Sequence, residues 1–329
     1  MRDDEPIRAA ADVPSPEHRI RATDANVHYA WDNSLDPVLT VAPGEVVRFE
    51  CRDATDGQLG VDATSADVHD LDFRGHPLTG PVAIEGAHPG DTLEVELLSL
   101  QHRGFGVTYF YEAGKGLLPD LFDEPFVHVW NLDGDVGRFV DGIEIPLAPF
   151  PGNLGVAPGD AGEHSTIPPR NVGGNLDVKH LTAGSTLSLP VEVDGALFSI
   201  GDCHAAQGDG EVCVTGIEAP MSVTVRFDVR SERSIDSPQF ETTGPFTPTG
   251  RDEPMYATTG VADDLMVATR RAVTAMINHL HDERSLSKPE AYALCSAAVD
   301  CKLSQVVNAP NWTVTAYLPE SIFPCADGN

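Results

Sequence analysis

Strict alternation of apolar and polar residues in three segments constrains the fold of this chain more than any other feature. Apolar residues occupy every second position over 92–98, 186–194 and 222–229. Successive side chains of a β-strand point to opposite faces of the sheet, so each segment predicts a strand with one buried face. Glycine turns precede the first two segments, at Gly90 and Gly184, as is typical of hairpins in a sandwich or barrel. We therefore predict a predominantly β, antiparallel, sandwich- or barrel-like core.

The pattern changes near the C-terminus, where helices are predicted. Apolar residues recur at helical spacing over 261–281, and Met266 and Met276 are among those predicted to be buried. The segment 287–290 has the Ser-x-x-Glu spacing of a capping box at the start of a second helix. An alternating segment over 312–318 predicts a final strand. The whole chain is therefore predicted to be α+β, with a C-terminal helical pair packed on a sheet.

Changes in composition divide the chain into three parts. The polar residues 1–22 predict a flexible N-terminal arm, 23–230 a β-rich core that carries the functional site, and 231–329 an α+β portion packed on that core. Two glycine-rich segments, 104–117 and 147–170, predict long connections of the kind that are usually functional or disordered. The aromatic residues of the first favour a packed lid.

The charge balance excludes several classes of partner. The 329 residues include 51 acidic and 21 basic side chains, which gives a formal net charge of −30. Nucleic acids and anionic membranes bind clustered Lys and Arg, so neither is an expected partner. An acidic chain poor in Lys is typical of proteins adapted to high salt, where ions screen the repulsion between like charges.

The cysteines and the N-terminal residues bear on cellular location. The six cysteines form no Cys-x-x-Cys pair, and free thiols are the norm in the cytosol. The first residues lack the basic and apolar regions of a signal peptide, and no run approaches the 18 apolar residues of a membrane span. We therefore expect a cytoplasmic protein.

The segment 201–211, Gly-Asp-Cys-His-Ala-Ala-Gln-Gly-Asp-Gly-Glu, is the most informative piece for function. On a strand, Asp202 and His204 would point to the same face. The turn at 208–210 would return the chain beside this strand, with Glu211 opening the next one. Two carboxylates and an imidazole at one spot predict a metal site or an acid/base site. The alternative is a capped loop exposed to solvent.

A second glycine-rich motif, Gly-Gly-Asn-Leu-Asp at 173–177, supplies further candidate residues. Its glycines would let the backbone approach a bound molecule closely, and Asn175 could donate a hydrogen bond to a carbonyl oxygen or an oxyanion. We therefore predict substrate-binding roles for Gly174 and Asn175 and a metal-ligand role for Asp177. A plain Asx turn at Asn175 and Asp177 is the alternative.

Several motifs together resemble the acetamidase/formamidase family of amidases. They are His-x-x-Trp-Asp at 28–32, Leu-Thr-Gly-Pro at 78–81, Gly-Ala-His-Pro-Gly-Asp at 86–91, Pro-Phe-Pro-Gly at 149–152, and the segments 171–177 and 201–211. They stand in the family's order within a region of similarity from about residue 25 to 325, nearly the whole chain. His88 departs from the pattern, because the family has an acid there. The resemblance implies an amidase that releases ammonia from formamide or acetamide, and a homo-oligomer.

Amide hydrolysis needs a strong nucleophile and stabilisation of the oxyanion that forms. A Ser-Ser-Lys site is disfavoured because the chain has no Gly-Ser-Ser cluster. A reactive-cysteine site is disfavoured because Asp202 and His204, rather than Lys or Arg, flank Cys203. A water activated by a divalent metal uses the residue types that the chain concentrates, and we favour this route.

For the metal route we assign Asp202, His204 and Asp177 as metal ligands. Glu211 is either a further ligand or the general base, and the sequence leaves both open. Zn²⁺ suits this set of imidazole and carboxylate groups, and a second, harder cation such as Ca²⁺ could occupy an oxygen-rich neighbouring position. Additional ligands to consider, each with a structural or surface role as the alternative, are His28, His69 and His76.

Two other functions are compatible with the sequence. One is a β-sandwich binding protein in which the Asp/His/Glu cluster holds a structural cation. The other is an enzyme that acts on a different carbonyl or amidine-like substrate with the same scaffold.

Overall fold

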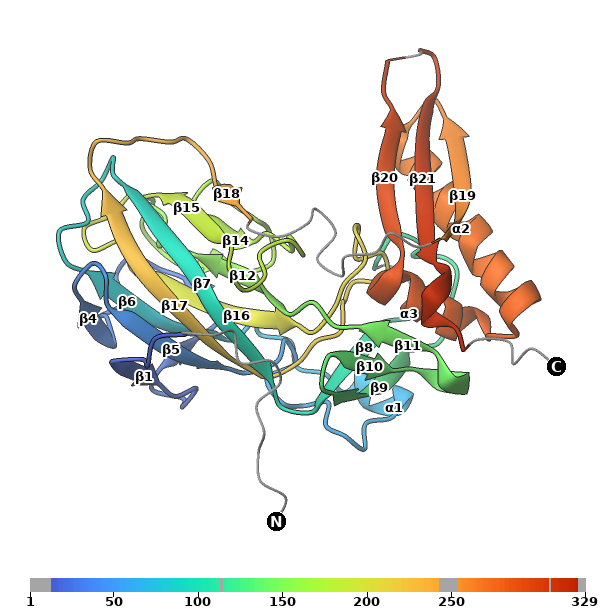
Figure 1. Ribbon diagram of the computed structural model, residues 1–329, viewed down its shortest axis with the longest axis horizontal. Helices are drawn as coiled ribbons and strands as arrows, with labels where there is room; N and C mark the ends of the chain where they lie inside the picture. The colour runs from blue at the N-terminus through green and yellow to red at the C-terminus, as the bar shows by residue number, and fades with distance from the viewer. Residues whose placement is uncertain (1–12, 113–114, 243–253, 308, 325–329) are drawn as a thin grey trace.

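The computed structural model describes residues 13–112, 115–242, 254–307 and 309–324, and its largest feature is a pair of stacked β-sheets (Figure 1). The first sheet has the strand order β1-β5-β17-β7-β15-β18. All neighbours in it are antiparallel except β1 and β5, which run parallel. The strands are β1 (His18–Ile20), β5 (Val46–Cys51), β7 (Thr92–His102), β15 (Thr186–Pro190), β17 (Met221–Arg230) and β18 (Gln239–Glu241).

The second sheet has the order β14-β12-β16-β6-β2, and β4 also pairs with β6. Its strands are β2 (Val27–His28), β4 (Leu39–Val41), β6 (Leu78–Ile84), β12 (Phe150–Gly155), β14 (Gly173–Asn175) and β16 (Phe198–His204). The two sheets face each other across an apolar core. In it, the buried rings of Phe49, Phe198 and Phe227 pack edge to face with centroids 5.1 to 6.5 Å apart. The predicted antiparallel sandwich is therefore confirmed.

The three predicted alternating strands are confirmed as β7, β15 and β17. Their apolar positions enter the core as the alternation requires, and Leu93, Val95 and Leu97 of β7 are fully buried. Strand β15 ends at Pro190, earlier than predicted. The chain turns beyond it, where Ala196 donates its N–H to the carbonyl of Val193.

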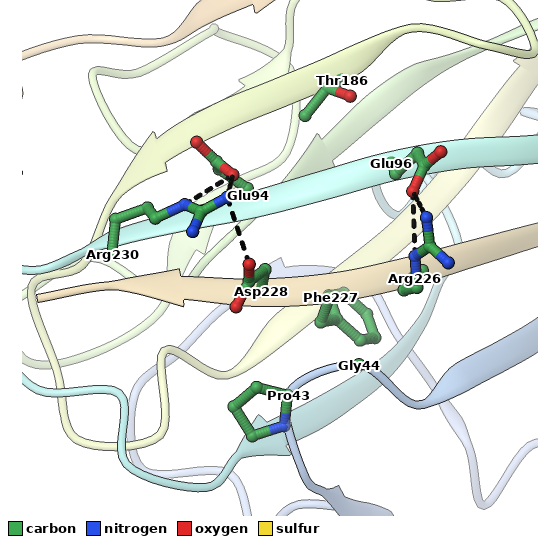
Figure 2. Close-up of a pocket in the computed structure, with 9 residues that line it drawn as sticks. All are labelled: Pro43, Gly44, Glu94, Glu96, Thr186, Arg226, Phe227, Asp228 and Arg230. Atoms are coloured by element: carbon green, nitrogen blue, oxygen red, sulfur yellow. Dashed lines mark hydrogen bonds and ion pairs between the residues drawn. The ribbon is translucent and has the colours of Figure 1, made fainter.

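The outer face of the first sheet carries cross-strand ion pairs around an open hollow of about 590 Å³ (Figure 2). Arg226 Nε donates to Glu96 Oε2 at 2.9 Å, and Arg230 Nε donates to Glu94 Oε2 at 2.9 Å. Arg226 lies directly opposite Glu96 in the register of β17 and β7. Exposed pairs of this kind contribute up to about 1 kcal/mol each, so burial of the opposite face remains the main stabilising effect.

A four-stranded sheet of order β11-β10-β9-β8 lies beside the sandwich. Strand β8 falls in segment 104–117, so the connection predicted there is wrong over Phe105–Phe110. The lid predicted from the aromatic residues of this segment stays a prediction. The glycines of this segment were interpreted as loop residues. Gly106 instead lies where β8 packs closely against the backbone at Glu218, because a Cβ there would be 2.8 Å from the carbonyl oxygen of Glu218. The strands are β8 (Phe105–Phe110), β9 (Phe126–Asp133), β10 (Val136–Arg138) and β11 (Glu144–Pro146).

The predicted connection over 147–170 is also wrong, because it contains β12, a buried strand of the second sheet. Gly155 of β12 lies so close to β14 that a Cβ would be 2.7 Å from the amide nitrogen of Gly174. The same segment contributes β13 (His164–Ser165), which pairs with β3 (Ala30–Trp31). Glycines that permit close backbone packing were thus interpreted as loop residues.

The C-terminal part forms a three-stranded sheet of order β19-β21-β20 with helices on one face (Figure 1). Its elements are β19 (Met255–Ala262), α2 (Leu265–Arg284), α3 (Lys288–Ala298), β20 (Asp300–Gln305) and β21 (Trp312–Pro319). The predicted helical pair is confirmed, including the capping box at Ser287 and Glu290. The remaining short helices are α1 (Ser65–His69) and 3₁₀ turns at Val140–Gly142 and Glu320–Ile322.

The first predicted helix needs two corrections. It begins at Leu265 rather than 261, because β19 extends to Ala262 and Asp264 caps the helix by accepting the N–H of Val267 at 2.8 Å. Met276 is buried as predicted, whereas Met266 is 52% exposed and does not belong to the core.

The first sheet extends beyond both predicted ends of the β-rich core. Residues 1–12 of the predicted arm lie outside the described residues, but His18–Ile20 already pair with β5 as β1. Strand β18 lies beyond residue 230 and still belongs to the first sheet.

The five described cysteines are free thiols, and Cys325 lies outside the described residues. Within the described part of the chain, no helix has the length and apolarity needed to cross a lipid bilayer.

The contact between β19 and α2 gives a first prediction. A Cβ at Gly260 would lie 1.9 Å from the carbonyl oxygen of Ala268, so Gly260→Ala forces the helix away from the sheet. We expect the free energy of unfolding to fall by about 1–3 kcal/mol, the usual cost of overpacking. The control is Gly60→Ala, where no atom lies within 4 Å of the new methyl group. Equal stability of the two variants in urea denaturation would contradict this packing.

Candidate active site

The candidate site lies at the end of β16, where Asp202 and His204 come together as predicted. Asp202 Oδ1 lies 3.6 Å from His204 Nε2, and both side chains are almost fully buried. Two further carboxylates approach the same nitrogen, Glu218 Oε2 at 3.1 Å and Glu211 Oε1 at 3.8 Å. A single imidazole nitrogen is thus surrounded by three carboxylates.

The predicted hairpin that would deliver Glu211 is wrong. Residues 205–217 form an irregular loop, and Glu211 lies in a turn of this loop rather than at the start of a strand. The chain returns to the site at Glu218, whose backbone exchanges two hydrogen bonds with Val107 of β8. Sequence reasoning missed Glu218, although an acid between Ile217 and Ala219 in an otherwise apolar stretch was a usable signal.

The second glycine-rich motif brings two more predicted residues to the site. Asp177 and Asn175 both line the cavity beside His204. Each has a buried side-chain Oδ1 atom without a hydrogen-bond partner. Gly174 lies on β14, opposite Leu154, and does not line the cavity, so Asn175 is the member of this predicted pair that faces the site.

Close backbone packing holds the cluster from behind. A Cβ at Gly152 of β12 would lie 2.6 Å from Asp177 Oδ1, 2.8 Å from the carbonyl oxygen of Asp202 and 3.1 Å from His204 Cε1. No larger residue fits there without displacing these groups. The glycine of the Pro-Phe-Pro-Gly motif therefore sets how closely β12 supports the site.

The backbone at three of the acids is strained. Asp177, Asp202 and Glu211 have φ values of 48°, 51° and 42°, in the left-handed region that residues with a Cβ rarely adopt. Such strain costs about 1–3 kcal/mol per residue and is concentrated at functional sites. Its occurrence at three clustered acids supports a functional rather than a purely structural role for the cluster.

Gln207 fixes the orientation of the imidazole. Its Nε2 donates to the carbonyl oxygen of Asp177 at 3.0 Å, which leaves Oε1 to pair with His204 Nδ1 at 2.7 Å. Because an amide oxygen only accepts, Nδ1 carries the proton and Nε2 points at the carboxylates. A histidine that ligates a metal is held in the same way, with one nitrogen donating to an acceptor and the other directed at the ion.

Burial and mutual repulsion change the proton affinity of the acids. Burial raises the pKa of Glu218 to about 8 and that of Asp177 to about 7. The pKa of Glu211 is raised well above its usual range by burial and by Asp177. Burial also opposes ionisation of Asp202, but the neighbouring His76 and His204 outweigh it and lower its pKa. The cluster therefore needs positive charge to remain ionised.

The donor atoms fit a divalent cation. Asp202, His204 and Glu218 offer atoms within 4.8 Å of one another, and so do Asp177, His204 and Glu211. The partnerless Oδ1 of Asp177 is an acceptor that a cation would satisfy. Both sets share His204, whose Nδ1 is occupied by Gln207, so their members are candidate ligands for one ion at Nε2. The predicted second cation would need a different set of oxygen atoms.

The three additional histidines considered from the sequence differ in position. His76 lines the cavity, with Nε2 3.7 Å from Asp202 Oδ2. His28 lies elsewhere, where Nδ1 pairs with the carbonyl of Ala30 and Nε2 with Ser199 Oγ. His69 is on α1, 3.3 Å from Glu112 near the surface. Only His76 of these three is placed to act at the site.

The cavity in front of the cluster has a volume of about 200 Å³. Its base is acidic, and its walls are largely aromatic and aliphatic. The residues that line it, besides the acids, Asn175 and the two histidines already described, are Ala54, Phe73, Tyr109, Tyr111, Lys115, Ile167, Val214 and Thr215.

A buried ion pair ties the site loop to the C-terminal part of the chain. The ammonium group of Lys179 pairs with Asp300 of β20 and lies 3.5 Å from Asp209 in the loop. The backbone N–H of Asp209 donates to Asp300 Oδ1 at 3.1 Å. Gly208 donates to the carbonyl of Ser296 in α3. The position of Glu211 therefore depends on β20 and α3.

Comparison with known proteins places the chain in a family. The model of the acetamidase/formamidase family matches residues 15–165 and 160–325. A formamidase from Methylophilus methylotrophus is 29% identical over an alignment of 377 positions that covers 93% of this chain and 92% of the relative. A solved gamma lactamase from Delftia acidovorans has a TM-score of 0.85 and 29% identity over 93% of each chain. A solved acetamidase from Bacillus halodurans has a TM-score of 0.65 and 33% identity, over 92% of this chain and 97% of that one.

The ion pair behind the loop gives a second prediction. Lys179→Met removes the buried cation beside the Asp300 carboxylate and leaves only the more exposed Lys302, 3.8 Å from Asp300 Oδ2. We expect the free energy of unfolding to fall by up to about 3 kcal/mol. Lys179→Met combined with Asp300→Asn removes both charges and should recover most of that loss, because the asparagine can still accept the N–H of Asp209. A single variant as stable as the parent in urea denaturation would rule out this role.

Proposed function

This chain belongs to the acetamidase/formamidase family of amidases, and we propose that it hydrolyses a short aliphatic amide, such as formamide or acetamide, to a carboxylate and ammonia. The observation that carries the proposal is the convergence of three carboxylates on His204 Nε2 at the base of a small cavity. A neutral amide has few atoms and no charge, so it suits a cavity of this size better than a polymer or an ion does.

We assign the cation to His204, Asp202 and Asp177, the ligands predicted from the sequence, together with Glu218. Nitrogen and carboxylate donors favour Zn²⁺. When bound, such an ion lowers the pKa of a water and polarises the amide carbonyl group. The shared imidazole argues for one ion at this position, and a second ion such as Ca²⁺ stays a prediction.

Three further residues are assigned roles in proton transfer, substrate binding and orientation of the imidazole. Glu211 lies close to Asp177 and His204. We assign it as the general base that accepts a proton from water and returns it to the leaving nitrogen. Asn175 faces the same cavity and is assigned to hold the amide through a hydrogen bond. Gln207 keeps His204 Nε2 directed at the cluster.

Removal of the metal tests the mechanism directly. We expect prolonged dialysis against a chelator to remove a stoichiometric divalent ion, measured by atomic emission, and to abolish ammonia release from formamide and acetamide. Added Zn²⁺ should restore both metal content and release. Full release by a protein shown to be free of metal would overturn the metal role and leave the amidase assignment standing.

Replacement of the general base separates catalysis from structure. Glu211→Gln should lower turnover by about 10²–10⁴-fold, the usual contribution of a general base, with little change in melting temperature. Glu85→Gln, at an exposed position outside the cavity, is the matched control and should retain parental turnover. A protein with only a structural cation would instead keep its function in Glu211→Gln and lose thermal stability on chelation.

A cyclic amide is a second candidate substrate. The similarity to the gamma lactamase and the aromatic cavity wall both favour it. Ring opening of γ-butyrolactam yields an amino acid and no ammonia, so product analysis by chromatography separates the two candidates. Enzymes for other carbonyl or amidine-like substrates would be detected in the same panel.

The proposal also includes the setting of the enzyme. We infer a cytoplasmic homo-oligomer adapted to high salt, on the basis of the unpaired thiols, the family resemblance and the net charge of −30. Light scattering and activity as a function of KCl concentration test these points.

A further inference from the structure

We infer that one wall of the cavity is a subsite for an apolar acyl group, so that the substrate is a primary amide with a carbon chain longer than that of acetamide. The inference rests on the proposed amidase function. The cavity lining includes the side chains of Tyr109, Tyr111, Phe73 and Ile167, and we call these four residues the acyl wall.

The cavity changes character with depth. Its base is formed by His204, Asp202 and Glu218, which are nearly inaccessible to solvent, and by the partly buried Glu211. Tyr109, which is only 3% exposed, begins the acyl wall beside this base. Ile167, which is 56% exposed, ends it at the mouth. A molecule with its amide at the acidic base would therefore extend its other end along apolar surface toward solvent.

The acyl wall is held in place by ring contacts. The rings of Tyr109 and Tyr111 meet edge to face with centroids 5.6 Å apart. The ammonium group of Lys115 lies 3.6 Å above the centre of the Tyr111 ring. The ring of Phe73 packs edge to face against His76 at 5.1 Å. These contacts preorganise the wall, which lowers the entropic cost of binding a chain against it.

The volume exceeds what the smallest amides need. A single water takes up about 30 Å³ of liquid volume, so a bound ion with its water would fill only a small part of the cavity's 200 Å³. Formamide has three heavy atoms and would leave most of the acyl wall exposed to solvent. Apolar surface left in contact with water contributes nothing to transition-state binding.

The direction of the chain follows from the reaction. Ammonia is released only if the amide nitrogen carries no carbon substituent. Any group that lies along the acyl wall must therefore belong to the acyl side of the substrate. Each methylene buried there contributes about 0.8 kcal/mol, which corresponds to about a fourfold rise in kcat/KM.

The test is a series of primary amides with the metal-loaded enzyme: formamide, acetamide, propionamide and butyramide. We expect kcat/KM to rise about fourfold per methylene, so that butyramide exceeds acetamide by about sixteenfold. In Ile167→Ala and in Tyr111→Ala the butyramide-to-acetamide ratio should fall several-fold. Ile167 is exposed, so its variant keeps the test decisive if Tyr111→Ala does not fold. Leu303→Ala, at a similarly exposed position on β20, is the control that should keep the parental ratio.

The results of this series distinguish failure of the acyl subsite from failure of the proposed amidase function. A kcat/KM that falls with each added methylene, or a ratio unchanged in both wall variants, would overturn the acyl subsite while leaving the amidase intact. Absence of ammonia from all four amides with a folded, metal-loaded protein would overturn the proposed function, and this inference with it.

Discussion

The structure depends on one arrangement: the Nε2 nitrogen of the buried His204 imidazole is aimed at a group of carboxylates that are largely shielded from water. Asp202, Glu211 and Glu218 all lie within 3.1 to 3.8 Å of His204 Nε2. Like charges this close repel strongly in a buried environment, and the raised pKa values of Glu211 and Glu218 reflect that repulsion together with burial. A divalent cation, as proposed, would remove the conflict, because it would replace protons as the source of positive charge and satisfy the buried oxygen atoms.

The rest of the fold keeps these groups together against their repulsion. The sandwich supplies β16 as a rigid support, and Gly152 of β12 lets the neighbouring strand pack directly behind the cluster. The left-handed backbone at Asp177, Asp202 and Glu211 stores strain that the surroundings must balance. Part of that balance comes from the C-terminal sheet and helices, which bind the loop of Glu211 through the buried charges around Lys179. The C-terminal part thus supports the site, although none of its described residues lines the cavity.

Sequence reasoning succeeded where local patterns determine structure and was wrong where packing does. Alternation identified β7, β15 and β17, and the Ser-x-x-Glu pattern located the start of α3, because both signals act within one element. Strands β8 and β12 were missed because their glycines serve contacts with chain segments far away in sequence. Asp202 and His204 were predicted together from the two-residue period of a strand and do meet, although the left-handed backbone at Asp202 departs from that period. Glu211 was brought to the right place by the wrong geometry, and Glu218 was missed, because a long irregular loop returns the chain to the site and no short-range pattern encodes its path.

The measurement that tests the account most directly is anomalous diffraction, above and below the zinc absorption edge, from crystals of the active protein. If the buried acids are held together by a cation, an anomalous peak will lie about 2.0–2.2 Å from His204 Nε2 and from oxygens of at least two of the surrounding carboxylates. Crystals of fully active protein with no peak there, and with Nε2 hydrogen-bonded directly to a carboxylate, would contradict the account.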